Sequence, residues 1–374
     1  MTTAPKSPGF TAVRLDRAKF ALDSFLTALA SGPHRAEMDT SLGKALQIFK
    51  LRAETLRRIE TAATRDPNNK HIRKDLDSAC ADMLQWQLVV NHWRYFGRPP
   101  RLSPPVTFNE HILHKIIYDR DPKLRMFCDK LAVRSYVERC VGSDYVVPVL
   151  GAWRHPSEIR FDKLPPSFVL KANHGSNFFL LINKLSDGEM KKIFATAQRW
   201  LDIDYFDVLF EWGYKDLPRW LVAEPVLYSS DSPALLEASV HTFNGTAKLI
   251  RIHCGTKFSS ESWQCFTDIA GRWLALKEEA PEKYFRLDSE IRKEMIFLSE
   301  RVSVGIPHLR VDFFLTDHGI KIGELTPYPG AGFNKWSPQR LDEELGKLWD
   351  SDYDISTFPD HEQQRHVESR AELT

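Results

Sequence analysis

The chain has 374 residues, of which 43% are hydrophobic and 27% charged, and its formal net charge is +1. This length and composition are typical of a soluble, globular protein with two or three domains. No apolar run approaches the roughly 18 residues of a membrane span. No GxxxxGK[ST] sequence is present, which excludes a P-loop nucleotide site on motif grounds.

The charge is unevenly distributed along the chain. Residues 1–105 hold 17 Lys and Arg against 10 Asp and Glu, a net charge of +7, whereas the remainder holds 34 against 40, or −6. A basic cluster on helices is usually a solvated face, but we expect this one to dock an anionic acceptor or partner. Its members are Arg52, Arg57, Arg58, Arg65, Lys70, Arg73 and Lys74.

The N-terminus and the cysteines bear on the cellular compartment. Residues 14–30 imitate a signal peptide, but Asp23 interrupts the apolar stretch, whose large residues follow helical i, i+3, i+4, i+7 spacing. We therefore predict an amphipathic helix there. The five cysteines are widely spaced, odd in number and without a CxxC pair, which predicts reduced thiols in a cytoplasmic protein.

Helical patterns dominate the first 142 residues. Residues 14–96 predict three or four packed helices. Gly97 to Pro100, with Pro104 and Pro105 shortly after, predict a linker. Residues 106–142 are again helical in pattern, and residues 146–153 have the pattern of a buried strand.

The middle of the chain predicts strands around a glycine-containing loop. Residues 168–171 and 178–182 have the pattern of strands joined by the loop 172–177, a layout that suits a flap folding over phosphates. A helix over 187–201 follows. Further strands are predicted at 220–227, 236–243 and 247–252, the last two joined by Asn244-Gly245, a strong hairpin signal.

The C-terminal third contains a second hairpin. A helix over 287–303 leads into two apolar runs that flank Asp317-His318-Gly319, and this triplet predicts a three-residue turn with Thr316 paired with Ile320. Ser337-Pro338 predicts the start of a last helix, with Ser as the N-cap, that ends near Trp349. A polar tail follows.

The side chains of this hairpin suggest chemistry. Counting back from the turn sets Asp312 opposite Glu324 and Arg310 opposite Thr326, all on one face. Directly opposed carboxylates about 5 Å apart repel, so a divalent cation such as Mg²⁺, held together with phosphate oxygens, would compensate them. The alternative is a solvated edge hairpin in which Arg310 neutralises both acids.

Four segments, in this order, resemble the ATP-grasp superfamily, specifically its TupA-like group, which is associated with teichuronopeptide and cell-surface polysaccharide biosynthesis. The likeness covers roughly residues 106–349 and is carried by TFNEHILHKIIYDRDPKLRMFCDKLAVRSYV, FVLKANHGSN, LVAEPVL, and RVDFF with GELTPYPGAGF. It implies an α/β (α+β) ATP-grasp fold with an N-terminal helical extension. The domains would be residues 1–100 (helical N-terminal region), 106–164 (first part of the body), 165–222 (flap subdomain), 223–349 (nucleotide- and magnesium-binding subdomain) and 350–374 (polar tail).

The resemblance also implies roles for individual residues. Lys130 and Lys171 match the family's two ATP lysines, and Arg310 the arginine that faces the acyl phosphate. Glu237 matches the acid that holds the ribose. The remaining matches are His174, Gly175 and Ser176 in the flap, Glu224, Val226 and Leu227 at the adenine, and Asp312, Glu324 and Thr326 as magnesium ligands. For His174, a hydrogen bond that stabilises the loop is an equal alternative.

Two residues depart from the family's pattern. Thr326 stands where many relatives carry Asn, which weakens the expected ligand set. Asn177 replaces the second glycine of the common HGSG, which predicts a stiffer flap.

The function implied by the resemblance is an ADP-forming, ATP-dependent carboxylate–amine ligase that acts through an acyl phosphate. It would join an amino acid or uronic acid to an amine in polysaccharide, peptide or natural-product biosynthesis, in the cytoplasm, with ATP, one or two Mg²⁺ or Mn²⁺ ions and no nucleic acid. Two alternatives stay open. One is a glycosyltransferase-like enzyme that uses Asp202-Ile203-Asp204 to hold a metal, and the other is a nucleotide-binding module without chemistry.

Overall fold

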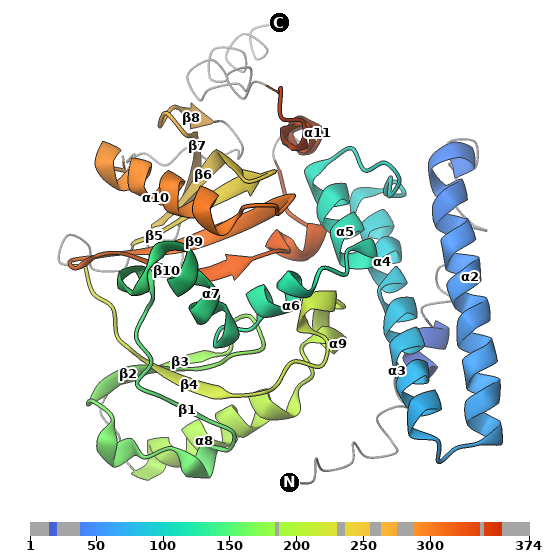
Figure 1. The fold of residues 1–374 in the computed structure, drawn as a ribbon, viewed down its shortest axis with the longest axis horizontal. Coiled ribbons are helices and arrows are strands. Elements are labelled where there is room, and N and C mark those ends of the chain that lie inside the picture. Colours follow the sequence, from blue (N-terminus) through green and yellow to red (C-terminus); the bar gives the residue numbers. More distant parts are fainter. Residues whose placement is uncertain are drawn as a thin grey trace, which may run out of the picture. The chain divides into compact units, whose positions relative to one another are not determined.

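The computed structural model describes residues 15–20, 38–183, 187–229, 236–254, 263–274, 287–336 and 340–353. The chain divides into two compact units (Figure 1). The first comprises residues 1–120, 208–212 and 330–334, and the second comprises residues 121–207, 213–329 and 335–374. None of the helices described in these ranges combines the length and the hydropathy needed to cross a bilayer.

The first unit contains the predicted N-terminal helices. They are α2 (Met38–Arg65), α3 (Lys70–Leu84), α4 (Trp86–Phe96) and α5 (Phe108–Tyr118). Asn69 caps α3 by accepting hydrogen bonds from the backbone N–H groups of His71 (3.0 Å) and Ile72 (3.3 Å). Thr107 and Glu110 form a capping box at the start of α5. The apolar residues Leu76, Cys80 and Met83 of α3 and Val90 of α4 are buried.

Residues 97–105, predicted as a linker, are packed within this unit. Leu102 is completely buried. Arg98 Nη1 and the backbone N–H of Arg101 donate to Glu110 Oε1 at 2.7 and 2.9 Å. Burial opposes ionisation of Glu110, but these hydrogen bonds and the charge of Arg98 outweigh it and lower its pKa. The segment therefore connects α4 to α5 as part of one core.

The basic residues Arg57 and Arg58 of α2 are exposed. Both form ion pairs with Glu54, and docking of the basic face to an anionic partner stays a prediction.

A buried histidine makes the stability of this unit depend on pH. His92 in α4 is 1% exposed, and within the described ranges neither ring nitrogen has a hydrogen-bond partner. Its ring packs against Phe96 and Phe333, with centroids 4.4 and 5.9 Å away. Burial lowers the pKa of His92 to about 4, because the charged imidazolium would be poorly solvated.

We expect His92→Leu to reduce the loss of stability in acid. Between pH 6.5 and about 4 the unfolded wild-type chain binds a proton at His92 that the folded chain does not, so folding stability falls as the pH falls. The leucine variant lacks this term, worth up to about 3 kcal/mol at roughly 1.4 kcal/mol per pKa unit. Denaturant unfolding at pH 7 and pH 4.5 measures the difference, and parallel losses in both proteins would contradict it.

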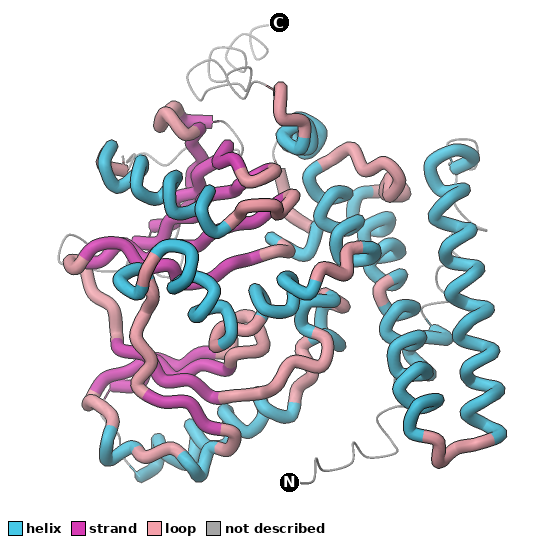
Figure 2. Tube along the Cα trace, in the orientation of Figure 1, coloured by secondary structure: helices cyan, strands magenta, loops and turns pink. Residues whose placement is uncertain are grey.

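The second unit contains two antiparallel sheets (Figures 1 and 2). The smaller has the order β1-β4-β2-β3 and consists of β1 (Gly151–Trp153), β4 (Leu221–Pro225), β2 (Ser167–Ala172) and β3 (Phe179–Asn183). Helix α8 (Asp187–Asp202) packs on it, and Ala197 and Trp200 share a buried cluster with Phe168, Leu170 and Leu221. The strand predicted for residues 146–153 is shorter than expected: only Gly151–Trp153 is a strand, and Val149 and Leu150 are exposed. Pro148, which has no N–H group for a ladder, accounts for the interruption.

The larger sheet carries the predicted hairpins. Its order is β10-β9-β5-β6-β7-β8, with β10 (Gly319–Thr326), β9 (His308–Thr316), β5 (Leu236–Phe243), β6 (Thr246–Cys254), β7 (Trp263–Asp268) and β8 (Trp273–Leu274). Helix α10 (Ser289–Val302) packs against β5 and β6. Asn244 and Gly245 have φ angles of 50° and 81°, as their predicted tight turn requires. Strands β7 and β8 were not predicted.

Short helices complete the second unit. They are α6 (Pro122–Cys128), α7 (Ala132–Val141) and α11 (Leu341–Gly346), while α9 (Phe206–Leu209) begins in the second unit and ends in the first. The predicted start of the last helix at Ser337-Pro338 lies outside the described residues, as do the amphipathic helix beyond residue 20 and the tail beyond residue 353. Cys80, Cys128, Cys140 and Cys265 are free thiols.

The hairpin β9–β10 reaches the predicted register by another route. Its turn has two residues, Asp317 and His318, so Thr316 pairs with Gly319 and the predicted pairing of Thr316 with Ile320 is wrong. A β-bulge between Ile322 and Glu324 then leaves Gly323 without a partner. This extra residue restores the predicted pairs, Glu324 with Asp312 and Thr326 with Arg310. A Cβ atom at Gly323 would lie 2.4 Å from the ring of Phe314, which explains the glycine.

Candidate active site

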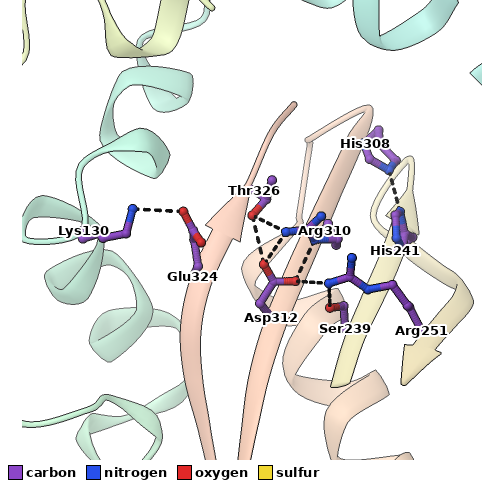
Figure 3. A network of polar contacts seen from close by, with 9 residues as sticks. All are labelled: Lys130, Ser239, His241, Arg251, His308, Arg310, Asp312, Glu324 and Thr326. Carbon is purple, nitrogen blue, oxygen red and sulfur yellow. Dashed lines mark hydrogen bonds and ion pairs between the residues drawn. The ribbon is translucent and has the colours of Figure 1, made fainter. Parts of the chain in front are cut away.

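Arg310, Asp312 and Thr326 form one hydrogen-bonded cluster on the hairpin (Figure 3). Arg310 Nε and Nη2 donate to the two carboxylate oxygens of Asp312, each at 2.7 Å. Thr326 Oγ1 donates to Asp312 Oδ2 at 3.0 Å and accepts from Arg310 Nη2 at 3.2 Å. Burial disfavours the ionised carboxyl, but the Arg310 guanidinium outweighs it and holds the pKa of Asp312 well below its ordinary value. Asp312 is therefore a carboxylate at any physiological pH.

Two residues that sequence reasoning missed extend this cluster. The register aligns Arg251, Ser239, Asp312 and Glu324 in one row across β6, β5, β9 and β10. Arg251 Nη2 donates to Ser239 Oγ at 2.9 Å and lies 3.9 Å from Asp312 Oδ1 (Figure 3). Burial and the nearby Arg310 lower the pKa of Arg251 to about 10, so it stays charged at neutral pH. The period-two pattern of β5 and β6 identifies their facing residues, but only the register between strands brings them to Asp312.

Lys130 connects the flap loop to the hairpin. It follows α6, and its Nζ donates to the carbonyl oxygen of Gly175 at 2.6 Å and to Glu324 Oε1 at 3.2 Å (Figure 3). The Lys130 side chain is 16% exposed and that of Glu324 is 30% exposed. An ammonium group and a carboxylate expected at the same phosphates thus already lie in contact.

Lys171 belongs to a buried ion-pair triad. It lies on β2, and its Nζ contacts Glu224 Oε2 on β4. Arg134 of α7 donates to Glu224 Oε1 at 3.0 Å. Glu224 is 5% exposed, so its charge is buried with two cations around it. Arg134 was not predicted, because its helical neighbours give no signal beyond an ordinary solvated face.

The flap loop is buried at its base and exposed at its tip. His174 is 2% exposed, and its Nε2 lies 2.9 Å from the carbonyl oxygen of Trp200. Burial lowers the pKa of His174, and Nδ1 lies 3.2 Å from Oδ1 of Asn173, so both ring nitrogens face polar atoms inside the protein, which favours the loop-stabilising role over a phosphate contact. Ser176 and Asn177 are exposed. Asn177 has φ +60°, and asparagine is, after glycine, among the residues that best tolerate this conformation.

The residues expected at the adenine and the ribose of ATP lie on or directly after strands of the two sheets. Val226 and Leu227 follow β4 and are half-buried. Glu237 lies on β5, opposite Phe314 of β9, close enough to Arg251 and Arg310 for its charge to raise the pKa of both. The predicted residues therefore occur on or directly after the strands β2 and β4 of the smaller sheet, in the flap loop, in the turn after α6, on β5 and on the hairpin. Direct contacts join them in three groups, around Asp312, Lys130 and Glu224.

Comparison with known families decides which architecture this is. The family profile described as "TupA-like ATPgrasp" matches residues 110–350, more than half of the chain. The chain belongs to the TupA-like ATP-grasp family. No curated protein is similar enough to count as a match.

Several solved structures resemble this ATP-grasp protein weakly. The D-alanine–D-alanine ligase from Bacillus anthracis complexed with ATP is 14% identical, with 66% of this chain and 68% of that chain covered and a TM-score of 0.37. The ATP-grasp ligase PsnB complexed with a minimal precursor is 10% identical, with 78% and 74% covered and a TM-score of 0.37. N5-carboxyaminoimidazole ribonucleotide synthetase from Thermus thermophilus is 12% identical, with 56% and 48% covered and a TM-score of 0.33. The chain thus spans about half the length of that synthetase.

The carboxylates of this ATP-grasp protein suit a hard cation. Asp312 and Glu324 are directly opposed oxygen donors, and the described residues contain no group of three or more His, Cys, Asp or Glu side chains that could hold a metal alone. That donor set fits Mg²⁺, which is usually bound by one or two carboxylates together with phosphate oxygens and water. Asp312 accepts two bonds from Arg310 and one from Thr326, so a metal bound there would share the carboxylate oxygens with these two side chains.

In the triplet Asp202-Ile203-Asp204, on which the glycosyltransferase alternative rests, Asp204 has a structural role. Asp204 is buried, accepts a hydrogen bond from the backbone N–H of Phe206 at 3.2 Å, and lies 3.5 Å from Arg219. Asp202, the last residue of α8, is exposed and accepts from Gln198 at 2.9 Å. Asp204 is therefore already used in a local hydrogen bond to the backbone and in an ion pair.

We expect Asp202→Ala to leave ADP formation within a few-fold of wild type, because none of the contacts described for the predicted site residues involves Asp202. The measurement is the steady-state rate of ADP release, with thermal unfolding as the control for folding. Complete loss of activity in a folded variant would favour the glycosyltransferase alternative.

Proposed function

We propose that this protein is an ATP-dependent, ADP-forming carboxylate–amine ligase. The observation that carries the proposal is the opposed pair Asp312 and Glu324 with Arg310 on the same face of the hairpin. Lys130 contacts Glu324 from outside the sheet. Family membership supports the use of ATP, and the acid and amine substrates are part of the proposal.

Each group has a role in phosphoryl transfer to a carboxylate. Lys130 and Lys171 neutralise phosphate charge from two directions, and Glu237 holds the ribose. Asp312 and Glu324, with Thr326 beside them, hold one or two Mg²⁺ ions, which when bound neutralise the phosphate oxygens. Arg310 stabilises charge on the group in transfer, and its fixed geometry removes the cost of reorganisation.

The reaction needs no protein nucleophile. The substrate carboxylate attacks the γ-phosphorus in line and forms an acyl phosphate with release of ADP, and an amine then displaces phosphate. In such a reaction positioning and charge neutralisation provide most of the rate enhancement. We propose an amino acid or a uronic acid as the acid, and cell-surface polysaccharide or peptide biosynthesis as the setting, in the cytoplasm.

ADP release from ATP and Mg²⁺ tests the proposal across a panel of amino acids and uronic acids, each with and without a panel of amines. The expected result is release that depends on one acid and produces an amide when the amine is present. A thermal-shift comparison of ATP with UDP-sugars separates the glycosyltransferase alternative. Stabilisation by ATP without turnover across the panel would favour the nucleotide-binding module instead.

A further inference from the structure

Asn173 lies between the two proposed ATP lysines. It comes two residues after Lys171, directly after β2, and its backbone carbonyl accepts a hydrogen bond from the backbone N–H of Lys130 at 3.0 Å. The residue is completely buried. It therefore joins the segment that carries one lysine to the segment that carries the other.

The side chain of Asn173 uses its full hydrogen-bonding capacity. Nδ2 donates to Asp129 Oδ1 at 2.8 Å and to the carbonyl oxygen of Pro218 at 2.9 Å. Oδ1 accepts from the backbone N–H of Trp220 at 2.7 Å and lies 3.2 Å from Nδ1 of His174. An amide offers two donors and one acceptor oxygen, and each is engaged here. A buried, fully satisfied amide of this kind fixes its partners, because any displacement leaves a polar group unpaired.

The bond to Asp129 fixes the backbone that carries Lys130. Asp129 Oδ1 also accepts from the backbone N–H groups of Leu131 (2.9 Å) and Ala132 (3.1 Å), so one oxygen holds the turn around Lys130 and the start of α7. Asp129 is 6% exposed, and a buried carboxylate oxygen of this kind orients its donors closely. Asn173 is the donor that ties this turn to β2.

The hydrogen bonds to Pro218 and Trp220 fix the backbone segment that directly precedes β4. The backbone N–H of Asn173 donates to the Trp220 carbonyl at 3.0 Å, so Asn173 and Trp220 are joined in both directions. Trp220 directly precedes β4, which carries Glu224, the partner of Lys171. One side chain thus connects three segments that each carry a charged group of the proposed site.

We propose that Asn173 is a positioning residue that sets the spacing of Lys130 and Lys171 and thereby the affinity for the nucleoside triphosphate. The inference rests on the proposed function, since it assumes that both lysines bind ATP phosphates. Asn173 is completely buried, so the proposed role does not require contact with the nucleotide. It acts through Asp129 and through the end of β2.

Binding of the fluorescent analogue mant-ATP with Mg²⁺ tests the role without an identified acid substrate. We expect Asn173→Ala to weaken binding about tenfold or more, because a displacement near 1 Å of a positioned group typically has an effect of that size or larger. Asn69→Ala is the matched control. It removes an asparagine side chain that bonds two backbone groups at the start of α3, so it should lower the melting temperature without changing the dissociation constant.

Charge variants distinguish positioning from general stability. Asn173→Asp places a second carboxylate where the amide lies 2.8 Å from Asp129, and the two repel unless they share a proton. The ratio of the variant's dissociation constant to that of the wild type should therefore rise between pH 5.5 and 8.5. The double variant Asp129→Asn with Asn173→Asp removes the repulsion between two carboxylates but leaves the Pro218 carbonyl without its donor, so it should recover part of the affinity at pH 8.5.

The outcomes are separable. Wild-type affinity in Asn173→Ala and Asn173→Asp at every pH would overturn the role of Asn173 while leaving the proposed function in place, as would a double variant no better than Asn173→Asp alone. If the wild type itself does not bind mant-ATP, the proposed function fails and the inference fails with it. A tenfold loss in Asn173→Ala, with rescue in the double variant, is the expected result.

Discussion

Glu324→Gln is expected to lower the rate of ADP formation by roughly 10²-fold or more while the protein stays folded. The carboxylate is one of the two opposed acids of the hairpin, and its replacement by a neutral amide removes the charge of a proposed metal ligand, at the point where we propose that phosphate charge is neutralised. The side chain is 30% exposed and its ion pair is the one with Lys130, so its loss should affect stability little.

The measurement combines ADP release with thermal unfolding. Glu290→Gln is the matched control, because Glu290 is also paired with a lysine, at 2.7 Å from Lys293, but lies exposed on α10. It should retain wild-type turnover. Turnover of Glu324→Gln close to that of the wild type would show that the hairpin is not the metal site.

Lys171→Ala is expected to have an effect of similar size on ADP formation. Lys171 lies on β2 of the smaller sheet, next to the flap loop. The loss of a positioned cation in phosphoryl transfer typically lowers the rate on the order of 10²-fold. Glu224 keeps Arg134 as a partner at 3.0 Å in the variant, so its buried carboxylate is not left without a cation and the fold should persist.

The position of the lysine can be separated from its charge. Lys171→Arg keeps a cation beside Glu224 but changes its shape and reach, and it should recover stability more completely than turnover. Lys192→Ala, at an exposed position of α8, is the control and should behave as the wild type. Equal turnover in Lys171→Ala and the wild type would exclude a role for this lysine in the reaction.

Much of the site could be predicted because its pattern is local. The alternation of β9 put Arg310 and Asp312 on one face, and the Asn-Gly turn located the neighbouring hairpin. Arg251 and Ser239 escaped prediction because they lie on other strands, and their contact with Asp312 depends on pairings between β5, β6 and β9 that no period reveals.

Some predictions failed because one or two residues determine a local structure that the surrounding pattern does not indicate. Pro148 shortened the strand expected at 146–153. The Gly-Pro segment after α4 looked like a linker by composition, but the apolar Leu102 and the pair of Arg98 with Glu110 pack it into a core. In the flap, His174 has polar partners inside the protein, which a sequence motif alone cannot distinguish from a phosphate contact.

The bulge at Gly323 makes β10 change the parity of its buried positions. Before the bulge the even-numbered Ile320 and Ile322 face the core, whereas after it the odd-numbered Leu325 does. Because side chains alternate along a regular strand, the same sequence paired without the bulge would carry Glu324 and Thr326 on the core side. The facing of Asp312 and Glu324 toward one site therefore depends on a bulge that takes a residue without a side chain out of the alternation.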